Sequence, residues 1–265
     1  MAILSQVMPL EKAHAIVLRL VDFSETSQVV TLFTREFGKI GALAKGAHRQ
    51  KGPFDSALDL LTLARVVFLR KSSGGLDLLT EAKLEHRFRP PDRDLAPLFA
   101  GYYLAELLLG LTDDYDPHPE LFDSAAETLQ MLSRDGETNI SPLMLAFEMN
   151  ALRLVGHLPN LEECVECGKP ISSDRLVAFG QSSGGVLCRS CRPGKRHIAQ
   201  IQGKSLKTLQ WYARCNGNAE QAPPYQITGE VRGVINHSIS HLLGREPKMQ
   251  RHLRFLVQEQ KMGPT

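Results

Sequence analysis

The sequence predicts a multidomain α+β protein that consists of a small N-terminal β-barrel, a helical bundle and a four-cysteine ribbon inserted into that bundle. Three observations lead to this prediction. Apolar residues alternate with a period of two before residue 88, the period becomes helical from Leu95, and two Cys-x-x-Cys pairs interrupt the helical part. A chain of 265 residues is also long enough for two or more domains.

The order of these patterns divides the chain into four segments. We expect the barrel in residues 1–88, the first part of the bundle in 89–160, the ribbon in 161–197 and the C-terminal part of the bundle in 198–265. Pro90 and Pro91 mark the first boundary, because proline cannot donate a hydrogen bond to a strand ladder.

Five short strands are predicted before this boundary, at residues 13–21, 28–34, 39–45, 58–69 and 76–84. Five strands in about 75 residues fit a small closed barrel, and the OB-fold is one such barrel. The fifth strand alternates most cleanly. Its predicted apolar face carries Leu76, Leu78, Thr80, Ala82 and Leu84, and its polar face carries Asp77, Glu81 and Lys83.

Helical periodicity follows. The first helix has an apolar stripe made by Leu95, Leu98, Phe99, Tyr102, Leu107, Leu108 and Leu111. A second helix is expected from Pro119 to about Ser133. Ser141 and Pro142 indicate an N-cap and a first helical position, so a third helix should run to Val155 and stop at Gly156. Helices resume at 203–214 and 230–243.

Four cysteines in the ribbon have the spacing of a metal site. Cys164 and Cys167 are followed, after twenty residues, by Cys188 and Cys191, which fits a tetrahedral four-cysteine zinc site. Such a closed shell predicts one structural zinc ion (Zn2+) rather than a catalytic one. The alternative is a pair of disulfides or a redox site, but a redox motif needs only one Cys-x-x-Cys. Lone Cys215 is expected to be a small core residue.

Charge is unevenly distributed along the chain. Residues 1–88 carry 12 basic and 9 acidic side chains, residues 89–160 carry 4 and 12, and residues 161–265 carry 15 and 8. Clustered positive charge at the two ends suggests an anionic partner, although ordinary solvated faces remain the alternative.

A basic loop in the barrel is the predicted phosphate-binding site. Lys39 and Lys45 share one face of the third strand, and Lys45 opens a loop that continues to Lys51. We expect the phosphodiester backbone to be held by Lys39, Lys45, His48, Arg49 and Lys51, with Arg70 and Lys71 as weaker contacts. Aromatic residues are few here, so base stacking is expected to be minor. A solvated hairpin with a run of charge is the alternative.

Several other classes of protein are disfavoured. The first ten residues do not have the pattern of a signal peptide, and the run from Leu95 to Leu111 is too short for a membrane span, so we expect no membrane association and a cytosolic location. His118-Pro119-Glu120 matches half of the zinc-deaminase signature, but Glu163 and Leu187, not proline, precede the cysteine pairs. Neither a Walker phosphate loop nor a Gly-x-Ser-x-Gly elbow occurs, so no enzymatic activity is predicted.

Several stretches together resemble the recombination mediator family RecO, a family of bacterial DNA repair proteins. The resemblance is carried by the basic stretch 45–47 leading to Pro53-Phe54, by 102–108, by Phe147-Glu148 with Leu152, Gly156, Pro159 and Leu161, by Phe179, Gly184, Gly185, Val186 and Cys188, and by 243–248. These stretches cover nearly the whole chain in the right order.

The resemblance implies an N-terminal OB-fold, a helical bundle and an inserted zinc ribbon, in a cytoplasmic, nucleoid-associated protein. It also implies binding to single- and double-stranded DNA, annealing of complementary strands, and cooperation with RecR in loading RecA onto DNA coated by single-strand-binding protein. In some members the helical domain holds the C-terminal tail of that coating protein. A zinc-ribbon adaptor that binds only proteins is the alternative function.

The sequence departs from the family pattern in places. His48 stands where many members have a basic residue, so one phosphate contact is missing at neutral pH. Met249 stands where a small polar residue is common. Some members lack the four cysteines, which implies that the zinc supports the structure rather than the shared activity.

Overall fold

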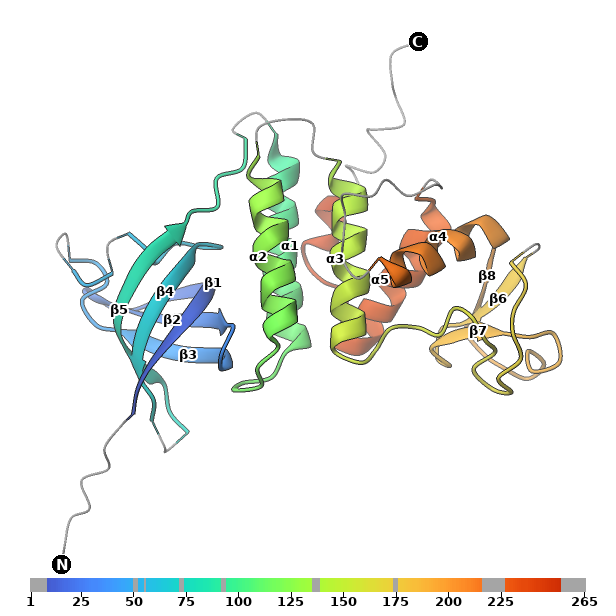
Figure 1. Ribbon diagram of the computed structural model, residues 1–265, viewed down its shortest axis with the longest axis horizontal. Helices are drawn as coiled ribbons and strands as arrows, with labels where there is room; N and C mark the ends of the chain where they lie inside the picture. Colours follow the sequence, from blue (N-terminus) through green and yellow to red (C-terminus); the bar gives the residue numbers. More distant parts are fainter. Residues whose placement is uncertain are drawn as a thin grey trace, which may run out of the picture. The chain divides into compact units, whose positions relative to one another are not determined.

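The computed structural model describes residues 9–49, 52–54, 56–71, 74–91, 94–134, 139–173, 176–215 and 227–253. The chain forms two compact units, Met1–Gly136 and Glu137–Thr265 (Figure 1). Among the described residues, the named elements of the first unit are the barrel strands and two helices, and those of the second are three helices and the ribbon. The predicted segment boundaries at residues 88, 160 and 197 stay a prediction.

Five strands close into an OB-like barrel, as predicted. They are β1 (Leu10–Ser24), β2 (Ser27–Thr34), β3 (Gly38–Ala44), β4 (Leu63–Leu69) and β5 (Asp77–His86), in the spatial order β1-β2-β3-β5-β4. All neighbours are antiparallel except β3 and β5, which are parallel. Closure leaves no free sheet edge.

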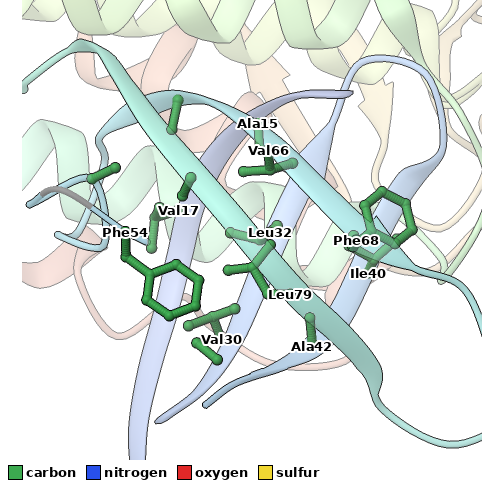
Figure 2. Packing of buried hydrophobic residues seen from close by; sticks show 14 of the residues in the cluster. Ala15, Val17, Val30, Leu32, Ile40, Ala42, Phe54, Val66, Phe68 and Leu79 are labelled. Carbon is green, nitrogen blue, oxygen red and sulfur yellow. The ribbon is translucent and has the colours of Figure 1, made fainter. Parts of the chain in front are cut away.

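Inward-pointing residues from every strand fill the barrel (Figure 2). Both small and large side chains point inward, and the larger ones include Leu32, Ile40, Phe68 and Leu79. Full burial of each large apolar side chain contributes roughly 1.5–3 kcal/mol to stability. The barrel interior is therefore a packed core, and any ligand must bind to its outer surface or its loops.

Two details of the predicted strands are wrong. The fourth strand begins at Leu63 rather than at residue 58, because Leu61 adopts a left-handed backbone conformation (φ 62°) that a strand cannot include. In β5 the pairing passes from Val67↔Glu81 to Phe68↔Leu79, so Thr80 is an extra residue in the ladder. This irregularity switches the faces of the strand, and Asp77 and Leu79 are buried.

Helices α1 (Leu95–Leu111) and α2 (Pro119–Leu132) belong to the same unit as the barrel. The Asp94 side chain caps α1 by accepting from the Ala96 amide at 2.8 Å. The rings of Phe33 on β2 and Phe122 on α2 lie 6.1 Å apart. The predicted apolar stripe of α1 is partly wrong, because the helix is apolar on most sides and buries Ala100, Tyr103, Leu104, Leu107 and Leu108 while Leu95 is exposed.

The second unit packs α3 (Ile140–Leu154), α4 (Gly203–Arg214) and α5 (Gly229–Leu243) against one another. Asn139, not Ser141, is the N-cap of α3, so Pro142 lies in the third helical position, still within the first turn. Gly156 ends the segment with a positive φ of 77°, as expected. Buried Glu148 of α3 is paired with the Arg232 guanidinium of α5.

The ribbon is a three-stranded antiparallel sheet of β6 (Val177–Gly180), β7 (Gly185–Leu187) and β8 (Ile198–Ile201), in the order β7-β6-β8. Gly184 lies in the turn between the first two strands and has a positive φ of 71° there. This sheet positions the two cysteine pairs.

Candidate metal centre and nucleic-acid interface

The four cysteines predicted to bind metal lie together at one end of the ribbon. The Sγ atoms of Cys164, Cys167, Cys188 and Cys191 all lie within 4.8 Å of one another. The Cys167 and Cys188 sulfurs are 3.7 Å apart. Zn–S bonds of about 2.3 Å would place the sulfurs of a tetrahedron about 3.8 Å apart. The cluster can therefore hold a metal ion without large movement.

Backbone turns bring each cysteine pair into place. In the first pair, the Gly168 amide donates to the Cys164 carbonyl at 2.8 Å, and Gly168 has a left-handed φ of 68°. In the second pair, the amides of Cys191 and Arg192 donate to the Cys188 carbonyl at 3.2 and 3.1 Å. Each turn points two sulfurs toward the same side, so two residues between the cysteines are enough for both sulfurs to reach one ion.

Strand β7 anchors the first turn to the sheet. The Val165 amide donates to the Val186 carbonyl at 3.1 Å, and the Val186 amide donates to the Asn160 carbonyl at 2.9 Å. A Cβ atom on Gly185 would lie 2.5 Å from that Asn160 oxygen, so only glycine permits this close approach. The cysteine positions therefore depend on the packing of the 160–165 segment against β7.

The thiols of Cys164 and Cys191 differ in pKa. Burial acts to raise the pKa of Cys164, but amide hydrogen bonds from Cys188 and from its own turn outweigh it and lower the pKa to about 6. Hydrogen bonding to the Cys188 side chain raises the pKa of Cys191 to about 12. A bound metal ion would replace the shared protons, because thiolates are the ligands. With all four positions taken by sulfur, no site remains for a catalytic water.

The predicted phosphate-binding loop begins with a tight turn at the end of β3. Gly46 has a φ of 77°, and the Arg49 amide donates to the Gly46 carbonyl at 3.1 Å. The His48 amide donates to the Thr26 carbonyl at 3.4 Å, and its imidazole Nε2 lies 3.2 Å from an Asp22 carboxylate oxygen. These contacts fix the basic turn, residues 45–49, against the turn between β1 and β2.

Lys45, His48 and Arg49 are exposed on this turn. Among the residues that the structure describes, neither Lys45 nor Arg49 forms an ion pair. Their charges are therefore not neutralised by any described carboxylate. Lys51, also predicted to bind phosphate, lies outside the described residues.

Arg70 and Lys71 lie at the other loop of the barrel, between β4 and β5. The Arg70 guanidinium is 4.5 Å from the centre of the Tyr115 ring, and the Lys71 amide donates to buried Asp77 at 2.9 Å. The Tyr115 hydroxyl donates to the other Asp77 oxygen. Burial, followed by this hydrogen bond, raises the pKa of Tyr115 above its ordinary value, so the hydroxyl stays protonated. The lysine side chain is exposed.

Lys39 has different surroundings. Its Nζ donates to the carbonyl oxygens of Leu109 and Thr112, at 3.0 and 2.5 Å, and its side chain is only 15% exposed. Helix α1 has no basic residue in its own last turn, so Lys39 supplies the positive charge that a helix C-terminus favours. The Lys39 ammonium group, which we expected to contact phosphate, thus donates its hydrogen bonds to the end of α1 instead.

Asp77 and Tyr115 are supporting residues that the sequence did not reveal. They orient the segment that carries Arg70 and Lys71, and they join it to the loop between α1 and α2, where the Tyr115 amide donates to the Lys39 carbonyl at 2.9 Å. The irregular pairing at Thr80 is what buries Asp77, and no sequence pattern signals it. In the described parts of the chain, no helix is both long enough and apolar enough to cross a membrane.

A closed OB-like barrel with an exposed basic turn, followed by helices and an inserted four-cysteine ribbon, defines a class of modular proteins with a basic surface on the barrel and a distinct metal-binding module. Residues 8–88 match the family described as "Recombination protein O N terminal", and residues 92–252 match "Recombination protein O C terminal". The chain therefore belongs to the RecO family of DNA repair proteins.

Individual relatives agree with this assignment. The chain is 41% identical over 261 residues to the DNA repair protein RecO of Rhodopirellula baltica, an alignment that covers 89% of this chain and 96% of that protein. It is 32% identical over 244 residues to RecO of Anaeromyxobacter dehalogenans (91% and 95% covered) and 29% identical over 256 residues to RecO of Halalkalibacterium halodurans (95% and 96% covered). The likeness thus extends through both units.

Proposed function

We propose that this protein is a recombination mediator that binds single- and double-stranded DNA, anneals complementary strands and, with RecR, helps to load RecA onto DNA coated by single-strand-binding protein. The observation that carries the proposal is the basic turn, in which Lys45 and Arg49 are exposed without a described ion-pair partner. Membership of a DNA repair family supports DNA as the anion.

Phosphate neutralisation is the proposed physical mechanism. Lys45 and Arg49, with His48 and Lys51 in the same loop and Arg70 and Lys71 in the next, would hold the backbone of a strand at the barrel rim. Two strands repel each other through their phosphates, so a surface that neutralises both lowers the barrier to pairing. No bond is made or broken in this process, and the proposal requires no enzymatic activity. Lys39 is the weakest member of the predicted set, because α1 already uses its charge.

The experiment that tests phosphate neutralisation reverses two charges at the basic turn. Lys45→Glu with Arg49→Glu should weaken binding to labelled DNA by at least about tenfold at moderate salt and flatten the salt dependence, because about two phosphate contacts are lost. Lys12→Glu with Lys83→Glu makes the same change in net charge at exposed positions on the opposite outer face, where Lys12 pairs with Val67 and Lys83 with Arg65. This control should bind nearly normally. Equal loss in both variants would assign the effect to net charge and not to the turn.

Annealing and loading need a separate assay. The protein should speed the annealing of complementary strands covered by single-strand-binding protein, and the basic-turn variant should not. We also propose that the helical part holds the C-terminal tail of single-strand-binding protein, without assigning residues. A protein-only adaptor is the other candidate function, and such a protein would not bind DNA at any salt concentration.

We propose that the metal in the cysteine cluster is one structural Zn2+. The fit of the sulfur positions to a tetrahedron supports this, and so does the all-sulfur ligand set, which suits zinc. The ion would fix the two turns relative to each other and to the sheet. It would take no part in DNA binding.

A further inference from the structure

One outer face of the barrel carries a row of apolar side chains. Val21 pairs with Val29, Val29 with Leu43, and Leu43 with Leu78, so the row crosses β1, β2, β3 and β5 without a break. The residues beside them in sequence, Val30 and Ala42, point into the barrel core. The row therefore faces outward.

Two further exposed residues lie beside this row in the ladder or the sequence. Leu76 lies over Gly41, where an added Cβ atom would come within 3.1 Å of its side chain, and it is 38% exposed. Phe23, at the irregularity that ends β1, is 65% exposed, and Val21 is 44% exposed. We call Val21, Phe23, Val29, Leu43, Leu76 and Leu78 the apolar platform.

The opposite outer face of the same barrel is an internal comparison. Its paired outward positions carry Lys12 and Glu81, which flank Val67, and His14, Arg65 and Lys83. Single exposed apolar residues need no explanation, but a set aligned across neighbouring strands marks a binding surface. Phe23, two residues after Val21, is the largest of the exposed apolar side chains among the described residues.

Positive charge borders the platform. Arg19 lies in the adjacent outward row, paired with Thr31, and Lys45 follows the end of β3 directly. Asp22, the neighbour of Phe23, contacts His48 and so joins this end of β1 to the basic turn. An apolar surface with cations at its edge is complementary to a single nucleic-acid strand, whose bases are apolar on their faces and whose backbone is anionic.

We propose that the apolar platform is a stacking surface for the unpaired bases of single-stranded DNA, with Phe23 as its principal contact. This inference rests on the proposed DNA-binding function of the barrel. Three spacings of about 4.8 Å between strands make the row roughly 14 Å long, enough for a few nucleotides. The proposed platform replaces the expectation that base stacking is minor. That expectation rested on the small number of aromatic residues in the barrel and not on their exposure.

The platform has a consequence for annealing. Stacking uses the face of a base and leaves its pairing edge open, so a strand held in this way can still meet its complement. Base faces are hidden in a duplex, so the platform favours single strands over double strands. Binding through the platform should also be insensitive to salt, unlike binding through phosphates.

Phe23→Ala tests the proposal with three probes: a single-stranded oligothymidine, an abasic oligonucleotide of equal length, and a duplex. We expect affinity for oligothymidine to fall about 5- to 150-fold, the range for loss of stacking with one base, with an unchanged salt slope. Affinity for the abasic strand and the duplex should change less than about twofold, because they offer no free base faces. Phe23→Trp should retain binding.

Leu95→Ala is the matched control, because Leu95 is 59% exposed at the start of α1, outside the barrel ladder. It should leave binding of all three probes unchanged, and thermal unfolding should show that both variants fold. Normal oligothymidine binding by Phe23→Ala would overturn the platform and point to a protein or a second copy of the chain as its occupant. An equal loss on the abasic strand would overturn it as well. If the basic-turn variant instead binds every probe normally, the proposed function itself fails.

Discussion

The four-cysteine cluster and the basic turn place their functional side chains by different means. In the cluster, two backbone turns bring four identical ligands within 4.8 Å of one another. In the basic turn, the significant feature of Lys45 and Arg49 is that no described side chain satisfies their charge. Lys39 and Lys45 lie on the same strand face in the sequence pattern, yet one caps α1 and the other is exposed. A convergent ligand set defines its own site, whereas the role of a charge depends on its neighbours.

The largest expected effect comes from removing one sulfur from the cluster. Cys188→Ser should abolish tight metal binding and unfold the ribbon, because structural zinc binding in small domains has an apparent free energy on the order of 10 kcal/mol and is coupled to folding. DNA affinity should stay within about twofold of the parent protein, because the proposed phosphate contacts lie in the barrel. Metal analysis of protein purified without chelator, together with limited proteolysis, measures the first effect.

Cys215→Ser is the control for that variant, because Cys215 is not part of the cluster. It should retain one metal ion per chain. If protein with all four cysteines contains no metal, the centre is not a metal site. If Cys188→Ser weakens DNA binding as much as the basic-turn variant, the cluster and the turn are not separate in function.

The second prediction contrasts two lysines. Lys39→Met should destabilise the barrel unit by about 1–3 kcal/mol, because two carbonyl groups at the end of α1 lose their donor in a mostly buried position. Lys45→Met should leave stability nearly unchanged and weaken DNA binding several-fold. Denaturant unfolding and fluorescence anisotropy separate the two effects. A Lys39→Met protein of full stability with weak DNA binding would return Lys39 to the phosphate-binding set.

The third prediction concerns the support of the β4–β5 loop. Tyr115→Phe removes the donor to buried Asp77 and should cost about 1–3 kcal/mol, because a carboxylate oxygen is left with one fewer partner. The ring that packs against Arg70 remains, so DNA binding should change little. Chemical denaturation gives the stability, and Tyr102→Phe provides a comparison at a half-buried tyrosine elsewhere in the same unit. An equal effect at both positions would contradict a special role for the Asp77 contact.

Sequence patterns predicted the parts of this molecule that depend on local repetition. The five strands, the helices and the convergence of the cysteines follow from alternation, helical period and a fixed spacing. The faces of β5 and α1 were assigned wrongly for physical reasons. An extra residue at Thr80 switches the pleat, and a helix that is apolar on most sides gives no preferred face. The buried face of β5 and the buried face of α1 are therefore both set by the elements that pack against them.

The candidate sites show the same division. The metal ligands are identical residues whose role needs no other information, and the structure brings them together. For the basic residues, the sequence does not show that the Lys39 ammonium group donates to a carbonyl group seventy residues later in the chain. Nor could it show that Phe23 is exposed beside the basic turn while other described phenylalanines, such as Phe33 and Phe68, are buried. Exposure is a property of the packed chain.

The smallest predicted effect tests whether the basic turn lacks one contact. His48 stands beside exposed Arg49, with its imidazole near Asp22. His48→Lys should add one phosphate contact, steepening the salt dependence for single strands by about 0.7 in the logarithmic slope and raising affinity about fivefold at 0.1 M salt. His14→Lys makes the same substitution between Glu36 and Glu85, on the opposite outer face of the barrel. If the two variants gain equally, the added charge acts over the whole barrel, and the basic turn has no privileged contact with the strand.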